Sequence, residues 1–563
     1  MDWPGKREAI ALANTPISKT LRPDVEASKN FFETGNLFIE GDNLEVLKLI
    51  QETYLGRIKM IYIDPPYNTG NDFIYEDDFK IKKNDFLISS AQQDASGDKL
   101  IANTSSNGRF HSDWIAMMYS RLRLAKNLLS DDGVIFISID DGECANLRKI
   151  GDEIFGETNF VANIIWQKKY SVSNDDPGIA DMHDHILVFR KSPHFARNLL
   201  PRSKKQDDRY ANPDNDPRGP WSSDNYISNN SKADRPTLYY PIVHPKTGEN
   251  VWPGENAWRY SKEKHEKMVA EDRLYWGPDM SYERPRMKRY LSEVPDGVVP
   301  STWWSFTDFG HNNEGSTEVN ELFGKKKIFT FPKPTRLLKE IIRIGSSSGD
   351  IVMDFFAGSG TTADALFQLC AETGENRQFI LVQAAENVDE KSEAASSGFT
   401  TISEITRERI HLAGNKVLEG ECDIDWNRDV GFRAFKVDSS NMKDVYYTPE
   451  ETNQQNLSNL SDNIKHGRTG EDLLFQVLID WGLDLSLSIR KETVQGKNVF
   501  FVDDGLLIAC FESSINEGLV KKLASHKPEC AVFRNSGFAS DTAKINAEQI
   551  FKQLSPETDV RAI

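Results

Sequence analysis

The sequence predicts an α/β protein whose centre is a doubly wound parallel sheet, and three observations support this fold class. Two separate segments of the chain repeat the order strand, loop, helix, strand. The predicted strands are short, continuous apolar runs, which is typical of strands buried on both faces. One loop between a strand and a helix is rich in glycine, as in sheets of this class that bind a ligand at their carboxyl edge.

The first half of the predicted sheet lies in the N-terminal part of the chain. One of its strands runs directly into Asp64, and another follows the turn Asp132-Gly133. The predicted elements in chain order are a strand at 37–39, a helix after residue 43, a strand at 60–63, a helix at 114–129 and a strand at 134–137.

The second half of the predicted sheet begins near residue 333. Its first strand ends at Asp354, and the glycine-rich loop follows immediately. The predicted elements are a helix from 334, a loop at 346–349, a strand at 351–353, a helix at 361–369 and a strand at 379–382.

The length and charge of the chain predict several domains. A chain of 563 residues exceeds the size of one ordinary hydrophobic core. The net charge is −18, yet residues 190–295 contain 20 Lys and Arg against 15 Asp and Glu, and a locally basic surface is compatible with a nucleic-acid partner. We expect four parts: two halves of the sheet domain at 1–195 and 326–415, an insertion at 196–325, and a small C-terminal α/β domain at 416–563.

The cysteines and the apolar segments indicate a soluble cytoplasmic protein without structural metal or disulfides. Five cysteines are scattered along the chain with no Cys-x-x-Cys pair. No apolar run approaches the roughly 18 residues of a membrane span, and the N-terminus lacks the pattern of a signal peptide. His183 and His185 have no third ligand at a suitable spacing, so we expect ordinary histidines and no bound metal.

The motif Asp64-Pro65-Pro66-Tyr67 places unusual chemistry directly after a predicted buried strand. Two consecutive prolines have fixed φ and no N–H, so the carbonyl groups of this turn are stiffly held and free to accept hydrogen bonds. Asp64 adds a carboxylate, and Tyr67 adds a flat surface on which a planar base can stack. These groups are what an enzyme needs to hold an exocyclic amino group.

The loop Phe356-Ala357-Gly358-Ser359-Gly360 follows the strand that ends at Asp354 and opens a helix. Glycine permits a tight turn and a close approach of the backbone to a ligand, and the start of a helix offers free N–H groups. Ala363 stands where a dinucleotide-binding loop has its third glycine, so a cofactor without a pyrophosphate fits better.

Together these two motifs closely resemble the signature motifs of the DNA methyltransferases that methylate exocyclic amino groups with S-adenosylmethionine. The catalytic motif precedes the cofactor motif and a long variable region separates them, which is similar to the β group of that family. Within this group the chain resembles the modification (Mod) subunits of type III restriction–modification systems. The resemblance covers roughly residues 1–415 and includes segments at 3–6, 39–44, 155–160, 303–304 and 331–334.

The resemblance implies a circularly permuted, Rossmann-like methyltransferase sheet with a target-recognition domain inserted at 196–325. In that fold the strands that end at Asp64 and Asp354 would be neighbours, about 4.8 Å apart. It implies double-stranded DNA as substrate, a homodimer, a restriction (Res) partner with helicase and nuclease activity, and a bacterial cytoplasmic location. The C-terminal part would then contact DNA, the second copy or the partner. The chain contains no Gly-x-x-x-x-Gly-Lys-Ser/Thr phosphate loop, so we expect that it does not use ATP itself.

The implied reaction is a direct in-line methyl transfer to N6 of an adenine that has left the base stack. Tyr67 would stack on the flipped base, while Asp64 and the carbonyl group of Pro65 would accept the amino hydrogens, with Pro66 holding the turn rigid. An aspartate at the first motif position favours adenine in this family. Transfer to cytosine N4 or to RNA remains an alternative, and so does a DNA-recognition subunit whose methylation site is vestigial.

The resemblance also assigns cofactor residues. The backbone of the glycine loop would surround the methionine portion, with Asp354 near its amino group. The family usually has an acidic residue after the next strand to hold the ribose hydroxyls, whereas this chain has Gln383, with Glu386 three residues later. The full expected set is Asp42, Lys333, Thr335, Asp354, Phe356, Ala357, Gly358, Ser359, Gly360 and Gln383.

Two further segments are candidates for contact with DNA. The densest basic cluster of the insertion would contact phosphates or guanine edges, and it consists of Arg284, Arg286, Lys288 and Arg289. The long polar stretch at 68–112 directly follows the catalytic turn, and we expect it to grip DNA or to assist base flipping.

Overall fold

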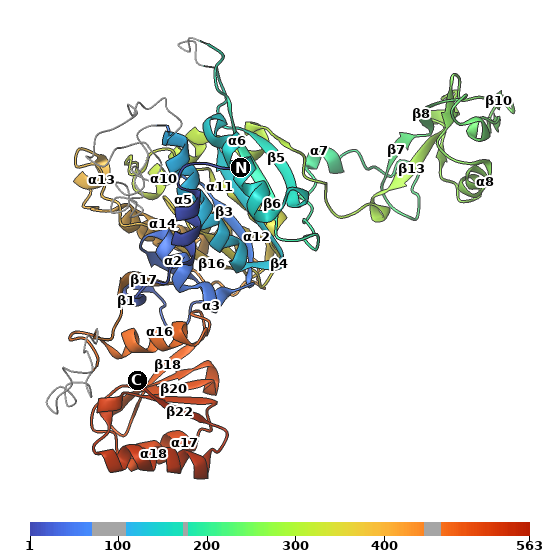
Figure 1. Cartoon of the computed structure of the whole chain (residues 1–563). Helices are drawn as coiled ribbons and strands as arrows, with labels where there is room; N and C mark the ends of the chain where they lie inside the picture. The colour runs from blue at the N-terminus through green and yellow to red at the C-terminus, as the bar shows by residue number, and fades with distance from the viewer. Residues whose placement is uncertain (70–108, 173–177, 444–462) are drawn as a thin grey trace. The chain divides into compact units, whose positions relative to one another are not determined.

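A computed structural model of the chain describes residues 1–69, 109–172, 178–443 and 463–563 (Figure 1). Its contacts divide the chain into two compact units, one of residues 1–198 with 301–563 and one of residues 199–300. Most of the stretch at 68–112 that we expect to grip DNA lies outside the described residues.

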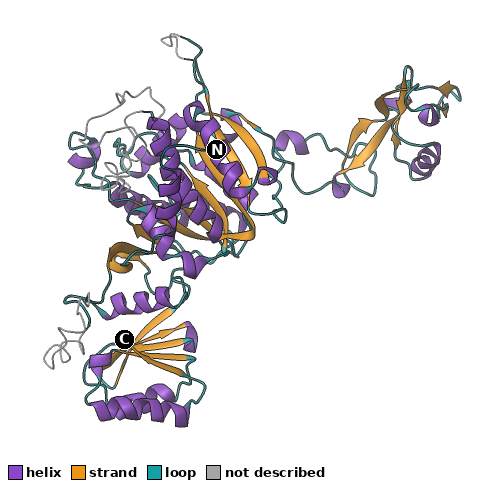
Figure 2. Ribbon diagram, viewed as in Figure 1, coloured by secondary structure: helices purple, strands orange, loops and turns teal. Residues whose placement is uncertain are grey.

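The larger unit contains a ten-stranded sheet that confirms the predicted fold class (Figure 2). Its six central strands, from β17 to β4, are parallel to one another. An antiparallel strand flanks them on each side, β1 next to β17 and β6 next to β4. The strands in spatial order are β1 (Lys19–Lys29), β17 (Phe432–Ser439), β2 (Leu37–Glu40), β16 (Gln378–Gln383), β15 (Ile351–Asp354), β3 (Ile58–Ile63), β4 (Leu129–Ile139), β6 (His183–Arg190), β5 (Phe160–Gln167) and β14 (Trp303–Trp304).

The two predicted halves of the sheet interleave at its centre. β15 pairs in parallel with β3, with Val352 opposite Met60 and Met353 opposite Ile61. Asp64 and Asp354, about 290 positions apart in the sequence, therefore follow adjacent strands at the same edge, as predicted. β16 completes this arrangement by pairing with both β15 and β2.

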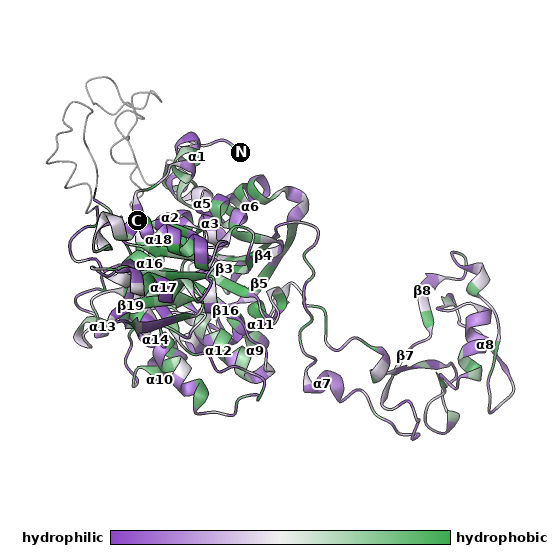
Figure 3. Ribbon diagram, turned by 90° about the horizontal axis from the view of Figure 1, so that it is seen from below, coloured by the Kyte–Doolittle hydropathy of each residue, from purple (hydrophilic) through white to green (hydrophobic). Residues whose placement is uncertain are grey.

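Helices cover both faces of the sheet, which explains why its central strands are apolar throughout (Figure 3). One layer contains α1 (Lys6–Asn14), α2 (Asn43–Leu49), α3 (Gln51–Tyr54), α5 (Arg109–Leu128) and α6 (Asp141–Phe155). The other contains α9 (Phe306–Phe309), α10 (Asn312–Leu322), α11 (Thr335–Gly345), α12 (Thr361–Thr373) and α14 (Ile402–Leu418). α13 (Glu393–Ser396) is a single turn before α14.

The unit of residues 199–300 consists of short strands around a small aromatic core, which includes Tyr226, Trp258 and Trp276. The sequence of this unit shows no sustained apolar period, which agrees with its irregular structure. Its elements are a sheet of β12 (Leu274–Tyr275), β13 (Arg286–Tyr290) and β7 (Trp221–Asn225), the pairs β8 (Ile227–Ser231) with β11 (Asn256–Trp258) and β9 (Ile242–Val243) with β10 (Asn250–Val251), and helices α7 (Lys204–Asp207) and α8 (Lys262–Ala270).

The end of the expected insertion, residues 301–325, lies in the larger unit instead. The reason is β14, which pairs with β5 at the edge of the large sheet. Trp304 is fully buried there and stacks on Phe309, whereas Trp303 is exposed.

The C-terminal part contains a five-stranded sheet, as the α/β expectation requires. Its strands are β18 (Ile489–Val494), β19 (Lys497–Val502), β20 (Leu507–Cys510), β21 (Cys530–Phe533) and β22 (Asp559–Ala562), and its helices are α16 (Gly470–Asp480), α17 (Glu517–Ala524) and α18 (Asp541–Leu554). β17 lies outside this sheet, because it joins β1 and β2 in the large one. Arg22 of β1 forms an ion pair with the buried Asp472 of α16.

All five cysteines are free thiols. Among the described residues, every helix is too short or too polar to cross a bilayer.

Candidate active site

A cavity of about 590 Å³ opens at the carboxyl edge of β3, β15 and β16, and both predicted motifs line it. From the catalytic motif come all four residues, and from the cofactor loop come the four residues Phe356 to Ser359. Side chains from several other segments complete the wall, including Lys168, Asp184, Phe329, Phe331, Lys333 and Glu386. The cavity therefore has one side formed by the Asp64 motif and another formed by the glycine loop.

The catalytic turn is anchored from the helical layer. The indole Nε1 of Trp114 donates to the carbonyl oxygen of Pro66 at 2.7 Å. Tyr62, on the strand before the turn, shares a 3.0 Å hydrogen bond with Ser138 of β4. Because the two prolines have fixed φ, these contacts hold the motif in one orientation toward the cavity.

Lys333 contacts the catalytic carboxylate, although the resemblance assigns it to the cofactor. Its Nζ donates to both carboxylate oxygens of Asp64 at 2.7 Å and to the Tyr67 hydroxyl oxygen at 3.0 Å. The ammonium group also lies 5.0 Å from the centre of the Tyr67 ring. A buried lysine thus balances the charge of Asp64 in the absence of a base.

The Tyr67 hydroxyl group connects the catalytic turn to β6. It donates to Asp184 at 3.2 Å, and Lys168 donates to the other oxygen of that carboxylate at 2.7 Å. Burial and the charges of Asp64 and Asp184 raise the pKa of Tyr67 well above its ordinary value, so the phenol stays protonated. The sequence contains one signal for Asp184: it is a charged residue at the start of an apolar run, which indicates a special role for its side chain.

The cofactor loop depends on glycine at two positions. Gly358 has φ 52° and Gly360 has φ 81°, which other residues adopt only with strain. The N–H of Gly358 donates to Gln383 at 2.7 Å, and Thr406 of α14 donates to the Gly358 carbonyl oxygen at 2.6 Å. Gln383 therefore holds the loop backbone in this structure while also lining the cavity.

Arg409 of α14 also holds the cofactor loop through side-chain contacts. Its fully buried guanidinium group donates to Ser359 and Thr361 at 2.7 Å and pairs with Asp364 at 3.0 Å. Asp364 is buried in the first turn of α12. One arginine thus fixes the end of the loop to the start of the helix, a contact that sequence patterns did not reveal.

Asp354 lines the cavity and is buried. It accepts hydrogen bonds from Thr362 at 2.6 Å and from the N–H of Phe356 at 3.0 Å. Burial raises its pKa to about 7 despite these two bonds. An acid with this pKa gains or loses its proton near neutral pH, and a cationic ligand would favour the ionised form.

Three expected cofactor residues lie outside the wall of this cavity: Asp42, Thr335 and Gly360. Asp42 caps α2 by accepting from the N–H groups of Leu44 and Glu45, and it lies 3.4 Å from Arg121. Thr335 donates through its N–H and hydroxyl groups to Glu318. Direct contact of these three with a cofactor stays a prediction.

The expectation that Lys288 contacts DNA needs correction, because its side chain is buried. It is 4% exposed and pairs with Asp214, Asp216 and Asp272, so its charge is directed into the small unit. The alternation of side chains along β13 is the reason, because it turns Lys288 inward and Arg289 outward. Arg284 and Arg289 are exposed and Arg286 is partly so, which keeps them available for contact.

Known proteins resemble this chain over most of its length. Residues 58–390 match the N6/N4 methyltransferase family, described as DNA methylase. The StyLTI Mod subunit, a type III restriction–modification protein of Salmonella typhimurium, is 37% identical over 77% of this chain and 66% of its own length. The EcoP15I Mod subunit of Escherichia coli is 30% identical over 96% of this chain and 87% of its own.

Among solved structures, the cytosine-N4-specific PvuII DNA methyltransferase aligns with a TM-score of 0.32 and 13% identity, over 70% of this chain and 98% of that one. The family match covers both motifs and the strands that carry them. The similarity to the Mod subunits extends beyond the family match, and for the EcoP15I Mod subunit it covers nearly the whole chain. This chain belongs to the N6/N4 DNA methylase family and is a DNA methyltransferase related to the type III Mod subunits.

Proposed function

We propose that the chain transfers a methyl group from S-adenosylmethionine to N6 of an adenine flipped out of double-stranded DNA, at a specific sequence, as the modification subunit of a type III system. One observation carries the proposal: the Asp64 motif and the glycine loop follow adjacent parallel strands and line the same cavity. A homodimer and a Res partner are part of the proposal, since the relatives are named as subunits of type III enzymes.

The cavity residues fit S-adenosylmethionine, which supplies an electrophilic methyl group on a cationic sulfur. Asp354 offers a carboxylate for the donor's ammonium group, and the loop from Phe356 to Ser359 offers backbone beside it. The half-buried Glu386 and the buried Gln383 offer acceptors for hydroxyl groups on the same wall. The cavity volume of about 590 Å³ lies within the usual range for a site of this kind.

The other wall suits an adenine base. Tyr67 supplies an aromatic face, and Asp64 with the Pro65 carbonyl group supplies acceptors for the two amino hydrogens. Accepting these hydrogens directs the nitrogen lone pair at the donor, so positioning and electrostatics do most of the catalysis. Lys333 donates to both carboxylate oxygens of Asp64. Asp64 would therefore accept hydrogen bonds from Lys333 and from the base at the same time.

Modification-sensitive sequencing of DNA from methylation-free cells that express this chain tests the proposal. We expect methylated adenine within one recurring sequence. Methylated cytosine would favour the cytosine-N4 alternative. Unmodified DNA together with failure of the purified chain to bind the donor would favour a recognition subunit with a vestigial site.

Donor binding is expected to strengthen as pH rises through the pKa of Asp354. The pKa is raised to about 7 by burial, so below pH 7 the carboxyl group is neutral and cannot pair with the donor's ammonium group. Affinity for S-adenosylmethionine should increase roughly tenfold between pH 6 and pH 8. Calorimetric titration at several pH values measures this.

The matched variant for this prediction is Asp354→Asn, which keeps the shape but does not ionise. It should bind the donor weakly and with little pH dependence over the same range. An Asp354→Asn protein that keeps the wild-type pH profile would assign the titration to another group.

Tyr67→Ala is expected to lower kcat/KM for duplex DNA about 10- to 100-fold, because base stacking on an aromatic side chain contributes roughly 1–3 kcal/mol. Tyr67→Phe keeps the ring and removes only the hydroxyl contacts to Asp184 and Lys333, so its loss should be several-fold smaller. Steady-state kinetics on one duplex compares the two. Equal losses would argue for a role of the hydroxyl group instead of the ring.

A further inference from the structure

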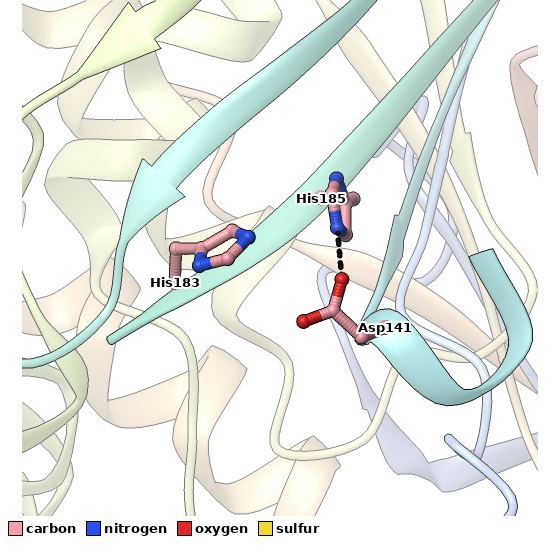
Figure 4. Close-up of side chains that lie close together, drawn as sticks. All are labelled: Asp141, His183 and His185. Atoms are coloured by element: carbon pink, nitrogen blue, oxygen red, sulfur yellow. Dashed lines mark hydrogen bonds and ion pairs between the residues drawn. The ribbon is translucent and has the colours of Figure 1, made fainter. Parts of the chain in front are cut away.

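Three potential metal ligands converge beside β6, away from the methyl-transfer cavity. They are His183 and His185 of β6 and Asp141 at the start of α6 (Figure 4). Their ligand atoms all lie within 4.8 Å of one another, and none of the three lines the cavity. Asp141 precedes His183 by 42 positions, so no local spacing indicated it as a third ligand.

The fold explains why these side chains meet. Alternation along β6 puts His183 and His185 on one face and sends Asp184 to the opposite face, where it meets Tyr67. β4 pairs with β6, and α6 begins directly after β4. Asp140 caps α6 by accepting from the N–H of Gly142, so Asp141 becomes the first helical residue, next to the two histidines.

The site already orients one imidazole ring. His185 Nε2 lies 2.7 Å from an Asp141 carboxylate oxygen, and the Asn163 amide oxygen lies 3.2 Å from His185 Nδ1. The Asn163 amide nitrogen lies 3.0 Å from the same Nδ1, so Asn163 contacts the ring on one side and Asp141 contacts it on the other. With an ion on Nε2, the Asn163 amide oxygen would accept from Nδ1–H, as outer partners of metal-binding histidines commonly do. His183 presents its ring edge-on to His185, with ring centres 5.0 Å apart.

We propose that His183, His185 and Asp141 bind one divalent transition-metal ion of the zinc class. Two imidazoles and one carboxylate are ligands that such ions favour, whereas Mg²⁺ and Ca²⁺ prefer oxygen alone. Three protein ligands leave a fourth position for water. The ion replaces the proton now shared by His185 and Asp141, and it ties the start of β6 to the start of α6.

The metal has a structural consequence near the active site without taking part in the reaction. Asp184 lies between the two histidine ligands, and its carboxylate accepts from Tyr67 and Lys168. Fixing His183 and His185 therefore fixes the strand segment that positions Asp184. We expect the ion to raise the thermal unfolding midpoint of the full chain, as any ligand bound only to the native state does.

Titration of the metal-stripped full chain with Zn²⁺, and separately with Co²⁺ while visible absorption is recorded, tests the proposal. We expect one equivalent of either ion to bind with micromolar or higher affinity. His185→Ala and Asp141→Asn should each weaken binding at least about tenfold. Asp141 is 72% exposed, so its substitution leaves the fold intact.

The chain offers a matched control in His194, which pairs with Asp131 on the surface. This pair has the same residue types, and no second histidine joins it among the described metal-ligand groups. His194→Ala should leave the stoichiometry and the affinity unchanged. Unchanged Zn²⁺ binding by a folded His183→Ala/His185→Ala protein, or no saturable binding by the wild type below about 1 mM, would overturn the proposal.

Discussion

Asp64→Ala is expected to lower the turnover number for methyl transfer by a factor on the order of 10³, because it removes a charged acceptor that acts on the reacting amino group. Asp64 lines the cavity and directly follows β3, which is adjacent to the strand that carries the cofactor loop. The donor should still bind, since Asp354 and the glycine loop are untouched. Single-turnover kinetics at saturating donor and DNA measures the effect.

Asp140→Ser is the matched control for this prediction. Asp140 follows β4, the other neighbour of β3, but it does not line the cavity. Serine preserves its capping of α6, so turnover should remain within a few-fold of wild type. Full turnover by the Asp64→Ala protein would refute the assigned role.

Arg409→Ala is expected to reduce the free energy of unfolding by about 3–5 kcal/mol, because it leaves the buried Asp364 carboxylate without its partner. The same change removes both hydrogen bonds that hold Ser359 and Thr361. Donor affinity should therefore fall even at temperatures where the protein remains folded. Denaturant unfolding and calorimetric titration of the same preparation measure the two effects.

Arg407, two residues earlier on α14, provides the comparison. Its ion pair with Glu40 is 3.3 Å long and lies away from the cofactor loop. Arg407→Ala should reduce the free energy of unfolding by less than Arg409→Ala does, because Arg407 and Glu40 keep some contact with solvent whereas Arg409 and Asp364 are almost fully buried. Donor affinity should stay unchanged. If the two variants lose equal stability and equal donor affinity, the inference that Arg409 stabilises the cofactor loop is wrong.

The sequence predicted the centre of the fold because local patterns specify it. Apolar runs predicted β3, β15 and β16 to within one or two residues at each end. The pairing of β15 with β3 was an expectation from the family resemblance, and the structure confirms it. The large sheet extends further than predicted, since β17 and β14 join it from segments assigned to other domains.

Contacts between side chains distant in sequence could not be predicted in the same way. Lys333 meets Asp64 across 269 positions, and Arg409 meets Ser359 across 50. No local period encodes such pairs, because they depend on how helices and loops pack on the sheet. Strand alternation over 286–290 separates Lys288 from Arg289, but it does not tell which of the two faces is buried. The burial of Lys288 therefore depends on the packing of the small unit.

Identification of the methylated nucleoside tests the central claim most directly. Purified chain would be incubated with unmethylated genomic DNA and S-adenosylmethionine that carries a deuterated methyl group, and the digested nucleosides would be analysed by mass spectrometry. We predict labelled N6-methyl-2′-deoxyadenosine with the wild type and none with Asp64→Ala. Labelled N4-methyl-2′-deoxycytidine, or no labelled nucleoside from a chain that binds the donor, would contradict this account.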